Sequence, residues 1–151
     1  MQEYVHYGAA EYVREKFQPV RNKRWRNKPE GGLWASAVDA PFGWKAWNES
    51  AECRDCSESC CFRFHLSDDA RILVIDSVDA ACALPERIPS DTLEYGIRVC
   101  YPVLPDFEKL FTMYDAIDFR ISEDRGLYRT MYSWDCDSLL VMNPDVIRED
   151  K

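Results

Sequence analysis

Two adjacent glycines, Gly31 and Gly32, constrain the fold of this chain more than any other feature of its sequence. Glycine has no side chain, so the backbone can turn sharply here or lie directly against another segment. Residues 33–36 then alternate apolar, aromatic, small and polar side chains, as in a β-strand. We therefore expect Trp34 to form the floor of a pocket for a flat ring. The alternative is a hairpin that leads into a core strand with a buried tryptophan.

The length and composition of the chain favour one folded domain over residues 1–151. Hydrophobic residues make up 46% of the 151 residues and aromatic residues 13%, which is enough to bury a substantial core. No apolar run has the length of a membrane span, and no signal peptide is recognisable. We therefore expect a cytoplasmic protein without membrane partners.

Strand patterns outnumber helical ones and do not alternate with them regularly. Helical spacing of apolar residues predicts helices over 44–56 and 106–114, with shorter helical segments at 9–17 and 77–84. In the first of these we assign Trp44 and Trp47 to the core. The expected strands are 4–7, 33–36, 62–66, 71–76 (as a central strand), 93–101, 114–121, 127–132 and 137–142. The pattern predicts an α+β fold with largely antiparallel sheets and a few short helices.

The charge distribution favours a small anionic ligand over a nucleic acid. Acidic residues outnumber basic ones by 27 to 19, which gives a net charge of −8 and argues against binding to duplex nucleic acid. Basic residues nevertheless gather between 14 and 28, just before the two glycines, where they can contact a phosphate group. A solvated loop without a partner is the simpler interpretation of this segment.

The cysteines and histidines limit the metal chemistry. Seven cysteines cannot all pair within one chain, and Cys60 and Cys61 are adjacent, which disfavours a shared zinc site with Cys53 and Cys56. We expect reduced thiols and no metal. The chain has two histidines, which excludes a multi-histidine site, and it lacks a Gly-x-Ser-x-Gly elbow and a phosphate-binding Gly-x-x-x-x-Gly-Lys loop.

Three segments far apart in the chain nevertheless share a recognisable order. They are His6–Tyr7–Gly8 in the first strand, the aromatic Trp34 after the glycine pair, and Asp137 at the start of a late apolar strand. This order resembles the ADP-ribosyltransferase superfamily, in the His–aromatic–acid branch that includes the poly(ADP-ribose) polymerases. Trp34 stands where that branch usually has tyrosine, and Asp137 stands where it usually has glutamate. Asp135 is a competing candidate for the acid.

The resemblance implies a split-sheet ADP-ribosyltransferase-like fold, NAD as the substrate and transfer of ADP-ribose to an unknown acceptor, such as a protein. A carboxylate would oppose the positive charge that develops on the ribose, and an aromatic face would stack on nicotinamide. The alternative is a non-enzymatic interaction module, either a degenerate member of this fold or an antitoxin-like partner of a basic protein. The catalytic residues would be Asp137 and His6, and the NAD-binding residues would be His6, Tyr7, Gly8, Gly32, Leu33, Trp34, Ser36, Arg24 and Lys28.

Overall fold

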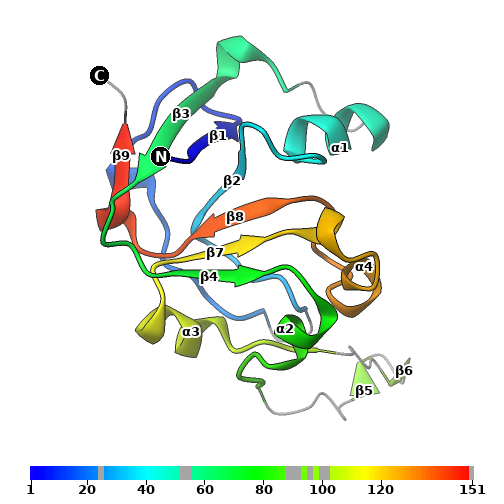
Figure 1. The fold of residues 1–151 in the computed structure, drawn as a ribbon. Helices are drawn as coiled ribbons and strands as arrows, with labels where there is room; N and C mark the ends of the chain where they lie inside the picture. Colours follow the sequence, from blue (N-terminus) through cyan, green and yellow to red (C-terminus); the bar gives the residue numbers. More distant parts are fainter. Residues whose placement is uncertain (24–25, 52–55, 88–92, 95–96, 99–102, 150–151) are drawn as a thin grey trace.

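A seven-stranded mixed β-sheet organises the chain in the computed structural model, which describes residues 1–23, 26–51, 56–87, 93–94, 97–98 and 103–149 (Figure 1). A separate two-stranded sheet is formed by β5 (Leu93–Glu94) and β6 (Ile97–Arg98). Across the large sheet the strands lie in the order β4 (Ile72–Ile75), β7 (Ala116–Phe119), β8 (Ser138–Val141), β2 (Leu33–Ala37), β1 (Glu3–Tyr7), β3 (Cys61–Leu66) and β9 (Ile147–Glu149).

Strand β2 connects the two halves of the sheet. Its first residues pair with β8, from Leu33 opposite Val141 to Ala35 opposite Leu139, and its last two residues pair with β1. Neighbouring strands are antiparallel except for β4 and β7, which are parallel. The strands that carry the histidine, the aromatic residue and the acidic segment are therefore neighbours, because β2 lies between β1 and β8.

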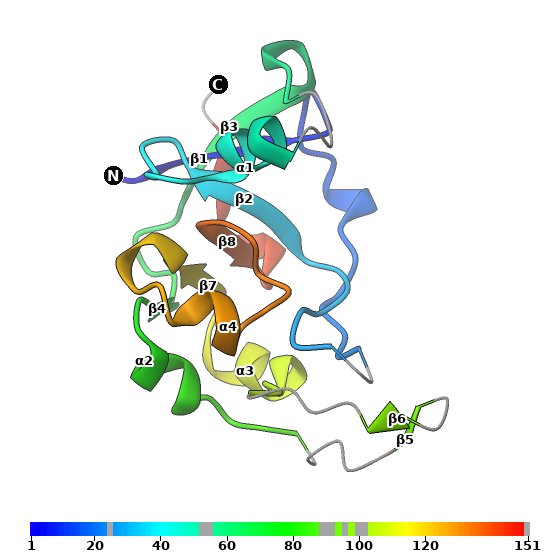
Figure 2. The same cartoon turned by 90° about the vertical axis from the view of Figure 1, so that its right-hand side faces the viewer.

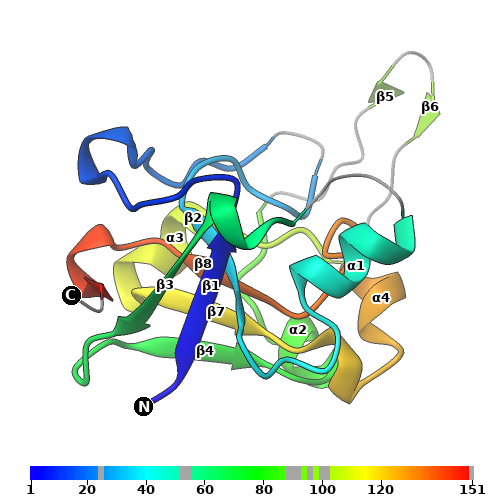
Figure 3. The same ribbon diagram turned by 90° about the horizontal axis from the view of Figure 1, so that it is seen from above.

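The described residues form four short helices, so the predicted α+β class is confirmed. They are α1 (Trp44–Ala51), α2 (Val78–Cys82), α3 (Phe107–Met113) and α4 (Leu127–Thr130). The side chains of Ser77 and Asp106 cap α2 and α3 by accepting backbone N–H groups from the first turn. Figures 1 and 3 show α1 and α4 at the same end of the sheet, the end that faces the viewer in Figure 2. None of the described helices has the length and hydropathy needed to cross a membrane.

Two clusters of buried side chains stabilise the two faces of the sheet. One includes Trp134, Phe107 and Phe119 beneath α2, α3 and α4, and the other includes Phe62 and Phe64 from β3. All four residues of β8 are buried, because this strand lies between both clusters. A central position of this kind explains the continuous apolar run near the C-terminus.

Several predicted elements differ from the observed ones. The segment 71–76 forms the edge strand β4, not a central strand, and Ile72 and Val74 are each 37% exposed. The segment 127–132 begins with the helix α4 and contains no strand, because Leu127 and Met131 are buried at helical spacing. Only a 3₁₀ turn, Arg14–Lys16, occurs within 9–17. Helix α1 ends at Ala51, and most of the predicted strand 93–101 and residues 52–55 lie outside the described residues.

Candidate functional site

A cavity of about 550 Å³ lies where β1, β2 and α1 meet the segment that precedes β8. Its volume falls in the range of small-molecule sites, and its walls are mainly aromatic with a few polar groups, as such sites usually are. The lining residues are His6, Tyr7, Gly8, Lys28, Trp34, Trp44, Trp47, Asn48, Cys56 and Asp135. The structure therefore brings together the predicted histidine segment, the predicted aromatic residue, one predicted cation and the competing acid.

The histidine is oriented by the neighbouring strand. His6 Nδ1 lies 2.6 Å from the carbonyl oxygen of Trp34, and because a carbonyl only accepts, Nδ1 carries the hydrogen. The ring also packs against Phe62, with 5.0 Å between the centroids. Gly8 directly follows this strand and has φ of +114°, a backbone conformation that is unfavourable for residues with a side chain. The His6 ring is thus held at the cavity, and its Nε2 has no hydrogen-bond partner among the described residues.

The glycine pair forms the predicted turn before β2. Gly31 and Gly32 both have positive φ, at +75° and +68°. A Cβ on Gly31 would lie 2.2 Å from the carbonyl oxygen of Pro19, and one on Gly32 would lie 2.5 Å from Leu140 Cδ1. The carbonyl of Gly31 accepts the indole N–H of Trp34 at 3.1 Å. The turn therefore fixes the Trp34 ring and lets the backbone pack closely.

Helix α1 provides the second aromatic wall. The rings of Trp34 and Trp44 are nearly perpendicular, at 85° with 6.4 Å between centroids, and Trp44 and Trp47 make a similar contact. The backbone N–H of Trp44 donates to Ser36 Oγ at 2.9 Å, which joins the start of the helix to β2. Buried Asn48 donates to Cys56 Sγ at 3.3 Å. These contacts position Trp44 beside Trp34, and Trp47 beside Trp44.

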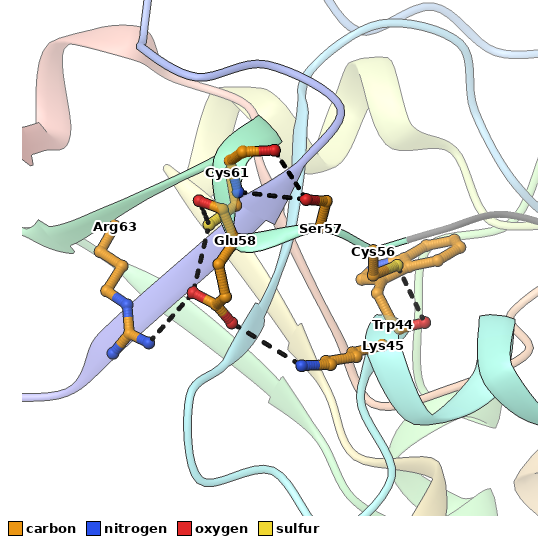
Figure 4. Close-up of polar contacts among 8 residues, drawn as sticks. Trp44, Lys45, Cys56, Ser57, Glu58, Cys61 and Arg63 are labelled. Carbon is orange, nitrogen blue, oxygen red and sulfur yellow. Dashed lines mark hydrogen bonds and ion pairs between the residues drawn. The ribbon is translucent and has the colours of Figure 1, made fainter.

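A polar cluster holds α1 against β3 (Figure 4). Glu58 lies 3.7 Å from Lys45 on α1 and 3.8 Å from Arg63 on β3. Cys61 Sγ donates to the carbonyl oxygen of Glu58 at 3.4 Å, and Cys56 Sγ lies 3.9 Å from the carbonyl oxygen of Trp44. Glu58 therefore connects the helix that bears Trp44 to the strand beside His6.

Lys28 carries a positive charge into the aromatic cavity. Its Nζ lies 4.6 Å from the ring centroid of Trp34 and 4.7 Å from that of Trp44, which are cation–π distances. Its ammonium makes no hydrogen bond or ion pair with a described residue. Burial lowers the pKa of Lys28, and the nearby Asp135 opposes that shift. Burial likewise raises the pKa of Asp135, and Lys28 opposes it. The cavity therefore holds two opposite charges that are both partly desolvated.

The indole nitrogen of Trp44 is a second donor without an acceptor. Its Nε1 is buried and has no hydrogen-bond partner among the described residues. A buried donor without a partner is costly. Because this N–H is not accessible from the cavity, the ammonium of Lys28 is the donor that favours a ligand with oxygen acceptors beside a flat ring.

The basic segment before the glycines is held by Arg87. Its guanidinium donates to the carbonyl oxygens of Lys23 and Arg26, each at 2.6 Å, and to that of Pro105 at 2.9 Å. These contacts position the chain that leads to Lys28. The predicted cation Arg24 lies outside the described residues.

The structure separates Asp137 from this cavity, so the carboxylate to which the sequence pattern assigned catalysis does not line it with His6 and Trp34. The Asp137 carboxylate accepts the backbone N–H groups of Ser122 at 2.9 Å and Phe42 at 3.2 Å, and the Ser122 hydroxyl at 2.5 Å. Asp137 is only 5% exposed and lies at a different cavity of about 290 Å³. Its hydrogen bonds hold two loops together, whereas Asp135 lines the aromatic cavity.

Three other predicted NAD-binding residues, Gly32, Leu33 and Ser36, pack in the core near the cavity. Gly32 packs against β8, and Leu33 is buried in the core cluster around Phe64. Ser36 is 2% exposed, and its hydroxyl donates to the carbonyl oxygen of Asp137 at 2.8 Å. None of these three residues lines the aromatic cavity.

The sequence did not predict Trp44, Trp47 and Asn48 as residues of the site, and it suggested Cys56 only as a zinc ligand. Trp44 and Trp47, which we assigned to the core, line the cavity together with Asn48 and Cys56. Their spacing marks one face of α1, but helical spacing is the same for a core face and for a cavity wall. The useful signal is that three tryptophans, at 34, 44 and 47, lie within fourteen residues.

The described cysteines outside the cavity form no metal-ligand cluster. Cys60, Cys61, Cys82 and Cys136 carry free thiols. Within the part of the chain that the structure describes, no three His, Cys, Asp or Glu side chains are arranged to hold a metal ion. Cys53 lies outside the described residues, so the expectation of no zinc site there stays a prediction.

Comparison of the chain with models of protein families, with curated proteins and with solved structures finds no match.

Proposed function

We propose that the aromatic cavity binds NAD and that the protein transfers ADP-ribose from it. One observation carries the proposal: His6, Trp34, Lys28 and Asp135 are far apart in sequence yet line one cavity. An aromatic wall, a cation and a carboxylate are the groups that a nicotinamide nucleotide needs. The chemistry of the residues, not a relative, supports this assignment.

Each residue has a distinct role in this proposal. The aromatic wall of Trp34, Trp44 and Trp47 packs against the nicotinamide ring, an interaction worth about 1 kcal/mol beyond the buried area. Lys28 donates to oxygen atoms of the ligand, and His6 binds a ribose hydroxyl through Nε2. As the bond between ribose and nicotinamide breaks, positive charge develops on the sugar, and the carboxylate of Asp135 opposes that charge. Asp135 thus takes the role that the sequence pattern gave to Asp137.

The arrangement of the strands supports an ADP-ribosyltransferase-like fold as part of the proposal. The histidine, aromatic and acidic segments lie on or next to β1, β2 and β8, which are neighbours in the sheet. Strand β2 connects two halves of that sheet, as expected for a split-sheet architecture. The adjacent free thiols of Cys60 and Cys61 support a reducing compartment such as the cytoplasm.

A binding protein without catalysis is the second candidate, and one observation favours it. The Asp137 carboxylate is engaged by Ser122 and Phe42, so the acid in the position of the family pattern does not face the cavity. In this alternative the cavity binds the nucleotide and releases it unchanged.

Calorimetry with NAD and an assay for released nicotinamide test both candidates. We expect wild-type protein to bind NAD and release nicotinamide. The variant Asp135→Asn should bind NAD with similar affinity and release nicotinamide about 100-fold more slowly, because it removes only the charge. Asp69→Asn is the matched control, because Asp69 is an exposed carboxylate outside the cavity. NAD binding without nicotinamide release supports the second candidate, and the lack of NAD binding contradicts both.

A further inference from the structure

The cavity of about 290 Å³ that Asp137 lines is separate from the aromatic cavity and shares no lining residue with it. It forms where β1 and the turn after β2 meet β7 and the 3₁₀ turn Ile121–Glu123. Among the described residues that line it, four are acidic and one is basic: Asp39, Asp118, Glu123 and Asp137 against Arg120. This polar cavity therefore has an excess of negative charge.

Two of its carboxylates have bonding capacity left for a ligand. Glu123 is exposed, and its side chain makes no hydrogen bond or ion pair with a described residue. Within the described chain, Asp39 accepts only the side-chain amide of Gln2, at 2.8 Å. Arg120 is by contrast occupied, because it donates to Asp118 Oδ2 through Nε at 2.9 Å and through Nη2 at 2.7 Å. The charges of Asp39 and Glu123 thus lack a cationic partner among the described residues.

The hydroxyl of Tyr4 is a buried polar group without a partner at the same cavity. Tyr4 is only 5% exposed, its ring packs 5.8 Å from that of Phe64, and its hydroxyl makes no hydrogen bond with any described residue. Burial and the charge of Asp118 raise the pKa of Tyr4 to about 12, and Arg120 opposes the shift. The hydroxyl therefore faces the charged lining and keeps its proton. Because a buried hydroxyl without a partner is costly, it points to a ligand that completes it.

The arrangement of the carboxylates favours an organic cation over a metal ion. Within the ranges that the structure describes, no three His, Cys, Asp or Glu side chains are arranged to hold a metal ion. The lining also includes the apolar side chains of Ala37, Ala40 and Pro41. An alkyl chain with an amino group at each end matches both features, since its methylene groups suit the apolar surface and its ends reach separate carboxylates.

We propose that the polar cavity binds a short aliphatic diamine or polyamine, with its ammonium groups on Asp39 and Glu123 and one N–H on the Tyr4 hydroxyl. An ammonium group has three donors, so an end that binds a carboxylate keeps a donor for a neutral oxygen. Hydrogen bonds between ionised groups are stronger than neutral ones, so two charged ends bind more tightly than one. The site requires neither NAD nor the proposed transfer of ADP-ribose.

Calorimetric titration with putrescine, a four-carbon diamine, tests the site at fixed ionic strength. Wild-type protein should bind it with one saturable site, about tenfold more tightly than butylamine, which lacks the second ammonium group. The double variant Asp39→Asn/Glu123→Gln should lose this binding, and it should stay folded because both side chains are exposed. Asp69→Asn/Glu15→Gln is the matched control, since it removes the same charge at exposed carboxylates outside the cavity and should bind as wild type does.

Two single variants locate the ligand. Tyr4→Phe keeps the ring beside Phe64 and removes the hydroxyl, so it should weaken putrescine binding about tenfold. Asp135→Asn alters only the aromatic cavity and should leave putrescine binding unchanged. Loss of binding in Asp135→Asn would place the diamine in the aromatic cavity and overturn the assignment. Unchanged affinity in Tyr4→Phe, equal affinity for putrescine and butylamine, binding that survives in the double variant, or no saturable binding to wild-type protein would also overturn it.

Discussion

The indole N–H of Trp134 donates to the carbonyl oxygen of Asn27 at 2.8 Å, and both residues are almost completely buried. Each is followed directly by a charged residue of the cavity, Lys28 after Asn27 and Asp135 after Trp134. The side chain of Asn27 also accepts the N–H of Ser133 at 3.3 Å. This contact thus connects two segments more than one hundred residues apart and brings their opposite charges to one site.

Replacing Trp134 with phenylalanine should therefore affect stability and ligand binding together. Trp134→Phe leaves the buried carbonyl of Asn27 without its donor and creates a small void beside Phe119. We expect a loss of about 2 kcal/mol in the free energy of unfolding, measured by urea denaturation. We also expect weaker NAD binding at temperatures where the variant is folded. Unchanged NAD affinity in the folded variant would show that this contact does not position Lys28 and Asp135.

Asp135 and Asp137 should respond to the same substitution in opposite ways. Asp137→Asn replaces one accepting oxygen with an amide that faces the donors of Ser122 and Phe42, so it should lose about 1–3 kcal/mol of stability. Asp135→Asn removes a carboxylate that burial already disfavours, so its stability should be equal to the wild type or higher. Thermal denaturation of both variants checks the contrast. A larger loss of stability in Asp135→Asn would contradict the roles assigned to the two residues.

The pH range over which the protein binds NAD and releases nicotinamide should be narrower than the ordinary pKa values of aspartate and lysine would give. Burial raises the pKa of Asp135 above 3.8, so the rate should fall on the acid side before an ordinary carboxylate is protonated. Burial lowers the pKa of Lys28 below 10.5, so NAD affinity should fall on the alkaline side before an ordinary lysine is deprotonated. A pH–rate profile measures both limits.

The variant Lys28→Arg tests whether Lys28 sets the alkaline limit of this profile, because arginine stays protonated across the pH range measured. We expect the limit to move to higher pH while NAD affinity stays within a few-fold of wild type. Lys28→Met should weaken NAD binding about tenfold at neutral pH, since it removes a charged donor. An alkaline limit that is the same in Lys28→Arg and wild type would exclude Lys28 as its source.

Local patterns in the sequence predict the strands of the site but not the choice of acid. Alternation over 33–36 and the apolar run after Asp137 are properties of neighbouring residues, and both segments form strands. Asp135 and Asp137 are two residues apart, so an ideal strand would place both side chains on one face. Strand β8 begins only at Ser138, and the chain before it turns so that the two carboxylates reach different cavities.

The tryptophans of α1 show why the wall of the cavity is harder to predict. Trp44 and Trp47 have the spacing of a buried face, yet Asn48 is the only buried residue of that helix. Trp44 contacts Trp34 and Lys28, and that relationship depends on where β2 and the basic segment lie in the fold. Contacts between distant segments of this kind leave no trace in local periodicity.

Asp115 provides a stability prediction that is independent of the cavity. Its carboxylate accepts the backbone N–H and the guanidinium of Arg71 at 2.9 to 3.1 Å and the amide of Asn143 at 2.9 Å. Its carbonyl oxygen also accepts the N–H of Met142 at 2.8 Å. Asp115 therefore connects the start of β4 to the end of β8. The variant Asp115→Asn should lose about 2 kcal/mol of stability at neutral pH.

The hydrogen bonds from Arg71 lower the pKa of Asp115 well below its ordinary value of 3.8. The folded protein therefore holds this carboxylate ionised where the unfolded chain protonates it. The stabilisation from Asp115 is complete above about pH 4 and is lost as the pH falls towards the lowered pKa. We expect the difference in unfolding free energy between wild type and Asp115→Asn to shrink steadily below pH 4 in urea titrations. Asp69→Asn is the matched control, because it makes the same change at an exposed carboxylate outside these hydrogen bonds. A difference that stays constant down to pH 2 would mean that the charge of Asp115 does not hold these strands together.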